Sequence, residues 1–203
     1  MDSELYLALL FCAFCVFSLK SERLPVGHGM TLGRHRISEG HLQELIDVPS
    51  PEIFWEKYVK TRTPVVFRDA AKHFPSFHLW TDDYLVKNFG ELEVKLESKR
   101  EKDEVPTGER GLGRDTIKSY LNVYKNKDSY VVSQLPDPMA KDVHVLSCLA
   151  CGSFSQRILE ANLWLSSGGT SSLLHRDADN AINCLLNGTK DWILINPQHE
   201  SNV

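Results

Sequence analysis

Residues 171–197, SSLLHRDADNAINCLLNGTKDWILINP, decide which fold this chain is expected to have. Asn187-Gly188 within this stretch is the dipeptide that a two-residue type I′ hairpin favours at its positive-φ positions. The segments on its two sides, Cys184–Leu186 and Thr189–Asp191, are therefore predicted to pair as antiparallel strands. A β-rich C-terminal region follows from this hairpin.

A further strand is predicted at Leu173–Asp177, just before the hairpin. Alternate side chains of a strand share a face, so His175 and Asp177 are expected to point the same way. An imidazole and a carboxylate side by side are two of the three ligands of the facial triad that binds non-haem Fe(II). In the hairpin, Lys190 shares its face with Trp192, and an ammonium in such apolar surroundings needs an anionic partner.

The remaining chain reads as helices followed by strands, which predicts an α+β fold ending in a sandwich or barrel. Charged residues and glycine mark Glu97–Arg114 as a solvated loop. The helices are expected at 41–46, from Ser50-Pro51 onward, at 84–89 after a Thr81 cap and at 115–123; the strands are expected at 65–67, 91–96, 130–132 and 158–165.

The composition is that of an ordinary globular protein, with 203 residues and a formal net charge of -4. Lysine and arginine are scattered rather than clustered, so nucleic acid is not expected as a partner. A protein-kinase catalytic loop is excluded because Ile182 stands where asparagine must follow His-Arg-Asp. A calcium loop starting at Asp177 lacks the central glycine and the terminal glutamate.

The N-terminus carries a short apolar segment, Leu5–Leu19, closed by Lys20. It is too short for a comfortable membrane span and is typical of a secretory signal, although an uncleaved anchor stays possible. Residues 1–20 are accordingly interpreted as a signal peptide or anchor and residues 21–36 as a linker. Either interpretation predicts the endoplasmic reticulum lumen or the extracellular space, with possible membrane anchoring through residues 5–19.

Three cysteines follow the leader, and the pair Cys148 and Cys151 forms a CxxC motif. No second CxxC or HxxxH completes a zinc set, so free or locally bridged thiols are expected. Cys184 is interpreted as a small buried hydrophobe on a strand. Asn187-Gly188-Thr189 is also a glycosylation sequon, but its position favours the turn interpretation.

Several motifs together resemble the Jumonji C (JmjC) branch of the cupin-like Fe(II)- and 2-oxoglutarate-dependent oxygenases. Residues 169–177, GTSSLLHRD, are similar to the family's approach to iron, and Lys190 lies fifteen residues past the histidine, where the family places a cosubstrate lysine. Upstream, residues 61–90 resemble the family's Pro-Val-Val strand and W-x-x-x-Tyr-Leu helix. The resemblance runs from about Ile37 to the end, so residues 37–203 are expected to form a partial JmjC/cupin-like domain.

The resemblance implies N-terminal helices packed on a mostly antiparallel double-stranded β-helix, a cupin or jelly-roll barrel. It assigns His175 and Asp177 to Fe(II). Cofactor binding is assigned to residues that would seat or line the 2-oxoglutarate pocket, namely Lys190, Ser172, Tyr130 and Trp164.

Two features depart from the family pattern. Ala181 replaces an asparagine that many hydroxylase members carry six positions after the histidine. The third iron ligand, a later histidine, is expected beyond residue 203, because His199 follows Asn196-Pro197 and is a poor candidate. The barrel is therefore expected to be incomplete at its C-terminus, and this chain is expected to be a fragment or truncated form that is inactive alone.

The expected function of the complete protein is oxygenation by Fe(II) and 2-oxoglutarate, as a dioxygenase that hydroxylates a protein side chain. The alternative is a non-catalytic cupin-like binding module, secreted or membrane-anchored.

Overall fold

The computed structural model describes residues 40–100, 111–158 and 160–202. The chain divides into two compact units, one of which spans Leu42–Trp192; the described residues of the other are 40–41 and 193–202. The expected leader and linker lie outside the described residues. Within the described part, no helix is long and apolar enough to cross a membrane.

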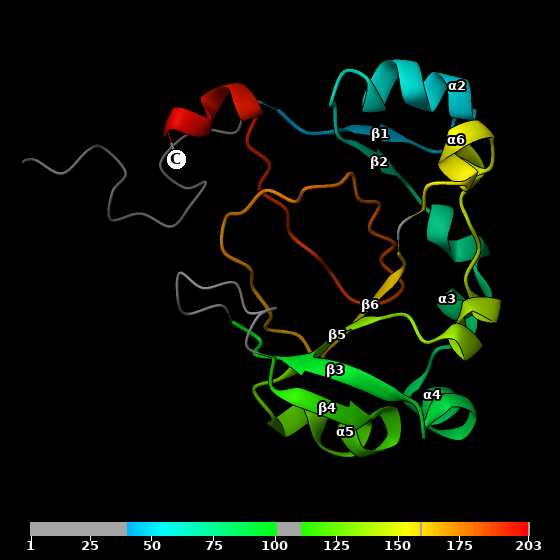
Figure 1. The fold of residues 1–203 in the computed structure, drawn as a ribbon, viewed down its shortest axis with the longest axis vertical. Coiled ribbons are helices and arrows are strands. Elements are labelled where there is room, and N and C mark those ends of the chain that lie inside the picture. The colour runs from blue at the N-terminus through cyan, green and yellow to red at the C-terminus, as the bar shows by residue number, and fades with distance from the viewer. Residues whose placement is uncertain (1–39, 101–110, 159, 203) are drawn as a thin grey trace, which may run out of the picture. The chain divides into compact units, whose positions relative to one another are not determined.

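The larger unit opens with two short parallel strands, β1 (Gln43–Leu45) and β2 (Val65–Phe67) (Figure 1). The strand prediction for 65–67 is confirmed, but the helix predicted at 41–46 is wrong. The local sequence of residues 41–46 does not reveal the strand with which they pair. Pairing with β2 provides partners for backbone hydrogen bonds of β1. Arg68 extends the pairing, because its guanidinium binds the Glu44 carboxylate and its backbone N–H donates to Leu45 O at 2.8 Å.

The helix predicted from Ser50-Pro51 is confirmed as α2 (Pro51–Phe54), which continues as the π-helical turn η1 (Trp55–Val59). Ser50 caps it, because its hydroxyl accepts a hydrogen bond from Ile53 N at 3.3 Å. Proline at the first helical position has no N–H to leave unsatisfied. These two local signals are sufficient to fix where the helix begins.

Helices of the middle segment follow capping threonines. Thr81 caps α4 (Asp82–Phe89) and Thr116 caps α5 (Ile117–Val123), each by accepting from a backbone N–H at 3.2 Å. Both helices were predicted. The short elements around them are η2 (Ala70–His73), α3 (Pro75–Leu79), η4 (Tyr124–Asn126), η5 (Asp137–Asp142), η6 (Ser147–Leu149) and α6 (Gly152–Ser155).

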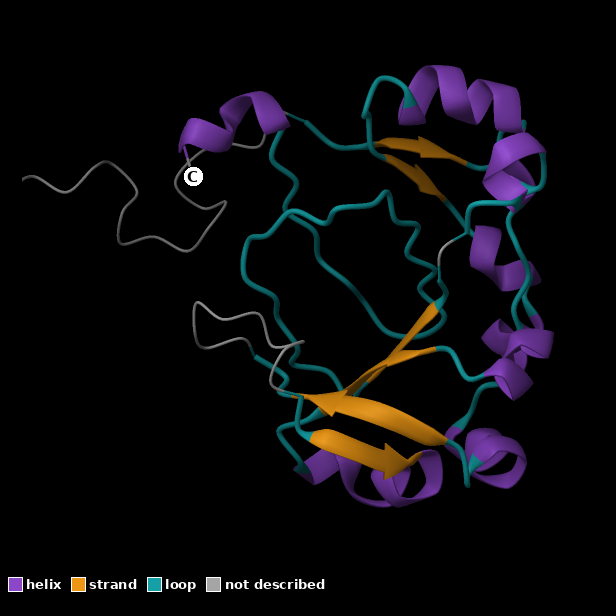
Figure 2. Cartoon of the chain, viewed as in Figure 1, coloured by secondary structure: helices purple, strands orange, loops and turns teal. Residues whose placement is uncertain are grey.

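The larger sheet of the unit is antiparallel and four-stranded, in the order β4-β3-β5-β6 (Figure 2). Its strands are β3 (Glu93–Glu97), β4 (Gly113–Thr116), β5 (Tyr130–Gln134) and β6 (Asn162–Leu165). Three of the strands were predicted, at least in part. The fourth strand, β4, shows that the loop predicted up to Arg114 was wrong at its C-terminal end. The polar residues of β4 form a strand because their backbone pairs with β3, and the local sequence does not reveal that partner.

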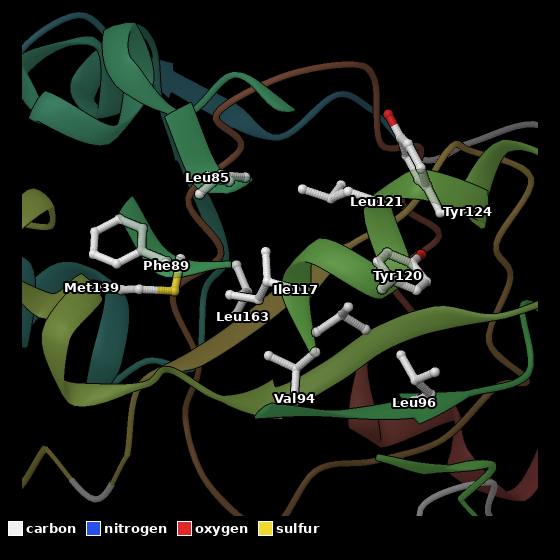
Figure 3. Close-up of a cluster of buried hydrophobic side chains, with 11 residues drawn as sticks. Leu85, Phe89, Val94, Leu96, Ile117, Tyr120, Leu121, Tyr124, Met139 and Leu163 are labelled. Carbon is white, nitrogen blue, oxygen red and sulfur yellow. The ribbon is translucent and has the colours of Figure 1, made fainter. Parts of the chain in front are cut away.

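One face of this sheet packs against α4 and α5 to form the main core (Figure 3). Alternation along the strands places Val94, Val131 and Leu163 on this face. Tyr120 is almost fully buried among them, and its hydroxyl lies 3.0 Å from Leu165 O and 3.2 Å from Ser129 O. The core thus ties α5 to the last strand of the sheet. A second cluster of buried residues is made of Phe54, Tyr58, Ala70, Phe74, Leu146 and Cys148.

Asp142 at the end of η5 is a buried carboxylate with two donors. Trp80 Nε1 donates to Asp142 Oδ2 at 3.0 Å, and the Tyr84 hydroxyl donates to the same oxygen at 3.1 Å. The carboxylate therefore joins η5 to the segment around α4.

The segment after β6 departs most from expectation. No strand is formed at 173–177 or on either side of Asn187-Gly188, and residues 172–196 carry no regular helix or strand. The chain does bend at that dipeptide, where Gly188 has a φ of 85°, but Asn187 does not share the positive φ that a type I′ turn requires. Cys184 is exposed and lies on no strand, which corrects the buried-strand interpretation.

The α+β class and the antiparallel sheet are thus confirmed for the described residues.

Candidate functional site

The sheet face opposite the core gathers the residues expected to line a cosubstrate pocket. Tyr130, Val132 and Trp164 share it, since alternate residues of β5 point the same way and Trp164 pairs directly with Val132. Tyr130 pairs with Glu97 at the other end of this face. We call this surface the open face.

Lys190 is held over the open face by aromatic rings. Its ammonium nitrogen lies 5.8 Å from the centroid of the Trp164 ring and 4.4 Å from that of Trp192, both within cation–π range. Desolvation lowers the pKa of Lys190, because these apolar surroundings disfavour the charged form. No carboxylate of the described residues lies within 4.0 Å of this nitrogen. The geometry is suited to an anion that would supply the missing charge.

His175 and Asp177 lie side by side in the segment that follows the sheet. His175 Nδ1 lies 2.7 Å from the backbone oxygen of Leu173, so this nitrogen carries the proton and donates it. The other ring nitrogen, Nε2, lies 3.5 Å from Asp177 Oδ1. An imidazole nitrogen and a carboxylate oxygen are two of the ligand types that bind non-haem Fe(II).

The spacing of His175 Nε2 and Asp177 Oδ1 is suited to two ligands of one cation. Neighbouring ligands of one octahedral metal, each bound at about 2.1 Å, lie about 3 Å apart. The observed 3.5 Å is close to that value, and both side chains are more than half exposed, so a small rotation closes the difference. A histidine whose other ring nitrogen donates to a backbone carbonyl is also the usual arrangement of a metal-binding imidazole.

Comparison with known proteins identifies the family of the chain. The family model of the cupin-like domain matches residues 50–203. The chain belongs to the cupin-like JmjC family. It is 27% identical over 191 residues to JmjC domain-containing protein 4 of Schizosaccharomyces pombe, covering 80% of this chain and 40% of that protein. It is 24% identical over 135 residues to lysine-specific demethylase 8 of Xenopus tropicalis, covering 64% of this chain and 30% of that protein.

The chain therefore spans less than half the length of these cupin-like relatives. Members of the JmjC family are 2-oxoglutarate-dependent oxygenases or demethylases, and they generally use Fe(II).

The residues expected to form the site lie in two separate groups. His175 is next to Asp177, and Lys190 is next to Trp164 and Trp192. No hydrogen bond or ion pair among the described side chains joins one part to the other. Ser172 is exposed, three residues before His175, and its hydroxyl makes no hydrogen bond with another described residue.

A third iron ligand is not found in the described residues, where no group of three or more His, Cys, Asp or Glu side chains is arranged to hold a metal. His199 belongs to the smaller unit and lies in η7 (Pro197–Asn202), where its ring contacts Gln198.

The sequence-based prediction missed one charged pair on the open face. Lys95 Nζ lies 3.2 Å from Glu97 Oε1, and the Glu97 carboxylate is only 7% exposed. Charge alternation in ELEVKL indicated a half-exposed strand, and that pattern could not show that one of its acids would be buried. The pair places a second ammonium on the same face as Tyr130.

Proposed function

We propose that this chain is the metal- and cosubstrate-binding part of an Fe(II)- and 2-oxoglutarate-dependent oxygenase that hydroxylates a protein side chain. The observation that carries the proposal is the 3.5 Å distance between His175 Nε2 and Asp177 Oδ1. A nitrogen and a carboxylate oxygen this close together can bind one cation as neighbouring ligands. The family membership of the chain supports Fe(II) as that cation.

Lys190 would bind the far carboxylate of 2-oxoglutarate. Its ammonium is placed by two indole rings and lacks a carboxylate partner among the described residues, so an incoming carboxylate restores the charge balance. Tyr130 and Ser172 would donate their hydroxyl protons to the same carboxylate, and Trp164 would cover the carbon chain of the cosubstrate. When bound together, Fe(II) and 2-oxoglutarate supply the oxidising chemistry with O2, which yields succinate and CO2.

The proposed metal site needs a third protein ligand, which would come from outside the described residues. The double-stranded β-helix is part of the same proposal, and the antiparallel four-stranded sheet of the described residues supports it. Secretory localisation is proposed from Leu5–Leu19 alone.

A non-catalytic binding module is the second candidate. The observation that favours it is the number of large apolar side chains that stay exposed between residues 158 and 194: Ile158, Trp164, Leu173, Leu174, Ile182, Leu185, Trp192, Ile193 and Leu194. Exposed apolar surface of this kind is typical of contact with a partner.

Anaerobic equilibrium dialysis of Fe(II) against the 203-residue chain separates the two candidates. The oxygenase proposal predicts Fe(II) binding, weakened by the missing third ligand, that falls further in His175→Ala and in Asp177→Ala. His73→Ala is the matched control, since His73 is exposed and lies in η2, outside the site. Binding that survives both site substitutions would contradict the proposed metal ligands and favour the binding module.

A further inference from the structure

A cleft with mostly basic walls lies beside the sheet, outside the residues proposed to bind iron and cosubstrate. Its volume is about 470 Å³. Three neighbouring connections build it: the residues after β3, the residues around η4, and the residues after β6. Its lining residues are Lys99, Arg100, Lys125, Asn126, Lys127, Asp128, Gly168 and Gly169.

Hydrogen bonds fix the relative position of these connections. Lys99 Nζ donates to Ser167 Oγ at 2.6 Å, and Ser167 Oγ donates to Tyr124 O at 3.1 Å. The backbone N–H of Ser171 donates to Lys99 O at 2.8 Å. Lys99 is half-buried as a result, so one wall of the cleft carries a held ammonium rather than a freely rotating one.

Among the described residues that line the cleft, four cationic side chains face one carboxylate, that of Asp128. Lys125 lies with its ammonium 5.8 Å from the centroid of the Tyr124 ring, and within the described residues none of the four cations has a carboxylate within 4.0 Å. In a chain whose net charge is -4, such a local excess attracts anionic groups.

We propose that this cleft binds an acidic segment of the protein that the enzyme modifies. The assignment of a substrate segment rests on the proposed function, since Gly169 precedes His175 by only six residues. Gly168 and Gly169 line the cleft without side chains, and among the described residues other than their chain neighbours a Cβ at either position would meet no atom within 4 Å, so a peptide backbone can approach closely. None of the described lining residues is aromatic, so they offer no ring on which nucleic-acid bases could stack.

Fluorescence anisotropy with a labelled hexaglutamate peptide tests this proposal on the full chain, without Fe(II) or 2-oxoglutarate. The peptide is expected to bind and to bind more weakly as salt rises. The double substitution Lys125→Glu and Lys127→Glu is expected to weaken binding by about tenfold or more, because it replaces two attractions by two repulsions. Both lysines are exposed, so the fold is expected to tolerate the change.

Lys57→Glu with Lys60→Glu is the matched control, with the same change of net charge at two exposed lysines of η1 and its C-terminal end. It is expected to weaken binding less than about twofold. The proposal is overturned if the peptide does not bind, if both double variants weaken it equally, or if a single-stranded oligodeoxythymidylate of equal charge binds more tightly. The peptide-binding assay needs no metal, so a negative result would not bear on the proposed oxygenase chemistry. Absence of Fe(II) binding would likewise not change the interpretation of the peptide-binding result.

Discussion

Replacing Lys190 by methionine is expected to weaken 2-oxoglutarate binding by about 10- to 150-fold. The substitution keeps most of the side-chain volume between Trp164 and Trp192 but removes the ammonium that lies 4.4 Å from one ring and 5.8 Å from the other. A hydrogen bond to a charged group contributes about 1.5–3 kcal/mol, which gives this range of dissociation constants. The two cation–π interactions of this ammonium contribute only about 0.5–1 kcal/mol each at exposed sites, so the variant should still fold.

Isothermal titration calorimetry of 2-oxoglutarate, with Fe(II) present and oxygen excluded, measures this decrease in affinity. Lys57→Met serves as the control, because that lysine is exposed and lies on η1, away from the open face. Tryptophan emission provides a second measurement, since two indole rings contact the ammonium. Equal affinity in Lys190→Met and wild type would refute the assignment of Lys190 to the cosubstrate carboxylate.

The same lysine predicts a pH dependence of binding. Desolvation lowers its pKa below the ordinary value of 10.5, and a bound carboxylate would raise the pKa again by favouring the ammonium. Binding is therefore expected to take up a proton at pH values between the free and bound pKa. Affinity should fall as pH rises through the free pKa of Lys190, and Lys190→Met should lack that decline.

Three further predictions concern stability and are checked by denaturant unfolding. Tyr120→Phe should cost about 1–2 kcal/mol, because Ser129 O and Leu165 O lose their hydroxyl donor. Burial raises the pKa of Tyr120, so the free energy of unfolding of the wild type should be constant below pH about 10 and fall as pH rises further. The Tyr120→Phe variant should lose less stability over the same pH range. Equal pH dependence of stability in the two proteins would contradict this expectation. Asp142→Ala should lower the free energy of unfolding by about 3 kcal/mol, because it leaves the Trp80 and Tyr84 donors unpaired. Asp142→Asn keeps an acceptor and should lower it less. Equal losses in the two variants would contradict the role given to these hydrogen bonds. Ser50→Ala should cost about 1 kcal/mol through the missing cap of α2, with Ser50→Thr as the conservative control; unchanged stability would show that Pro51 alone starts the helix.

Local signals predicted the helices because caps act within one turn. Ser50, Thr81 and Thr116 each accept a hydrogen bond from the residue three positions later, so the sequence alone contains both partners. Strand β1 was missed because its partner, β2, lies about twenty residues away and the pairing is parallel. Strand β4 was missed for a similar reason, since its polar residues gain a ladder only beside β3.

The assignment of residues to the candidate site stays a prediction, but the backbone expected for residues 173–177 was wrong. Strand alternation was the reason for placing His175 beside Asp177, yet the two meet in a segment without regular structure, where the Leu173 carbonyl orients the ring. A strand needs a neighbouring ladder, and among the described residues none pairs with this segment beyond the bridge between Arg100 and Ser171. The burial of Glu97 could not be predicted, because alternation reports which face a residue occupies and not what covers it.

The central claim is that the acceptor pair of His175 and Asp177 and the ammonium of Lys190 act on one bound cosubstrate. The most direct measurement is the dissociation constant of 2-oxoglutarate with and without Fe(II), under anaerobic conditions, in wild type and in Asp177→Ala. One shared site predicts that Fe(II) tightens binding by about tenfold or more, about 1.4 kcal/mol of coupling, in wild type only. An affinity that is independent of Fe(II) in both proteins would contradict the claim.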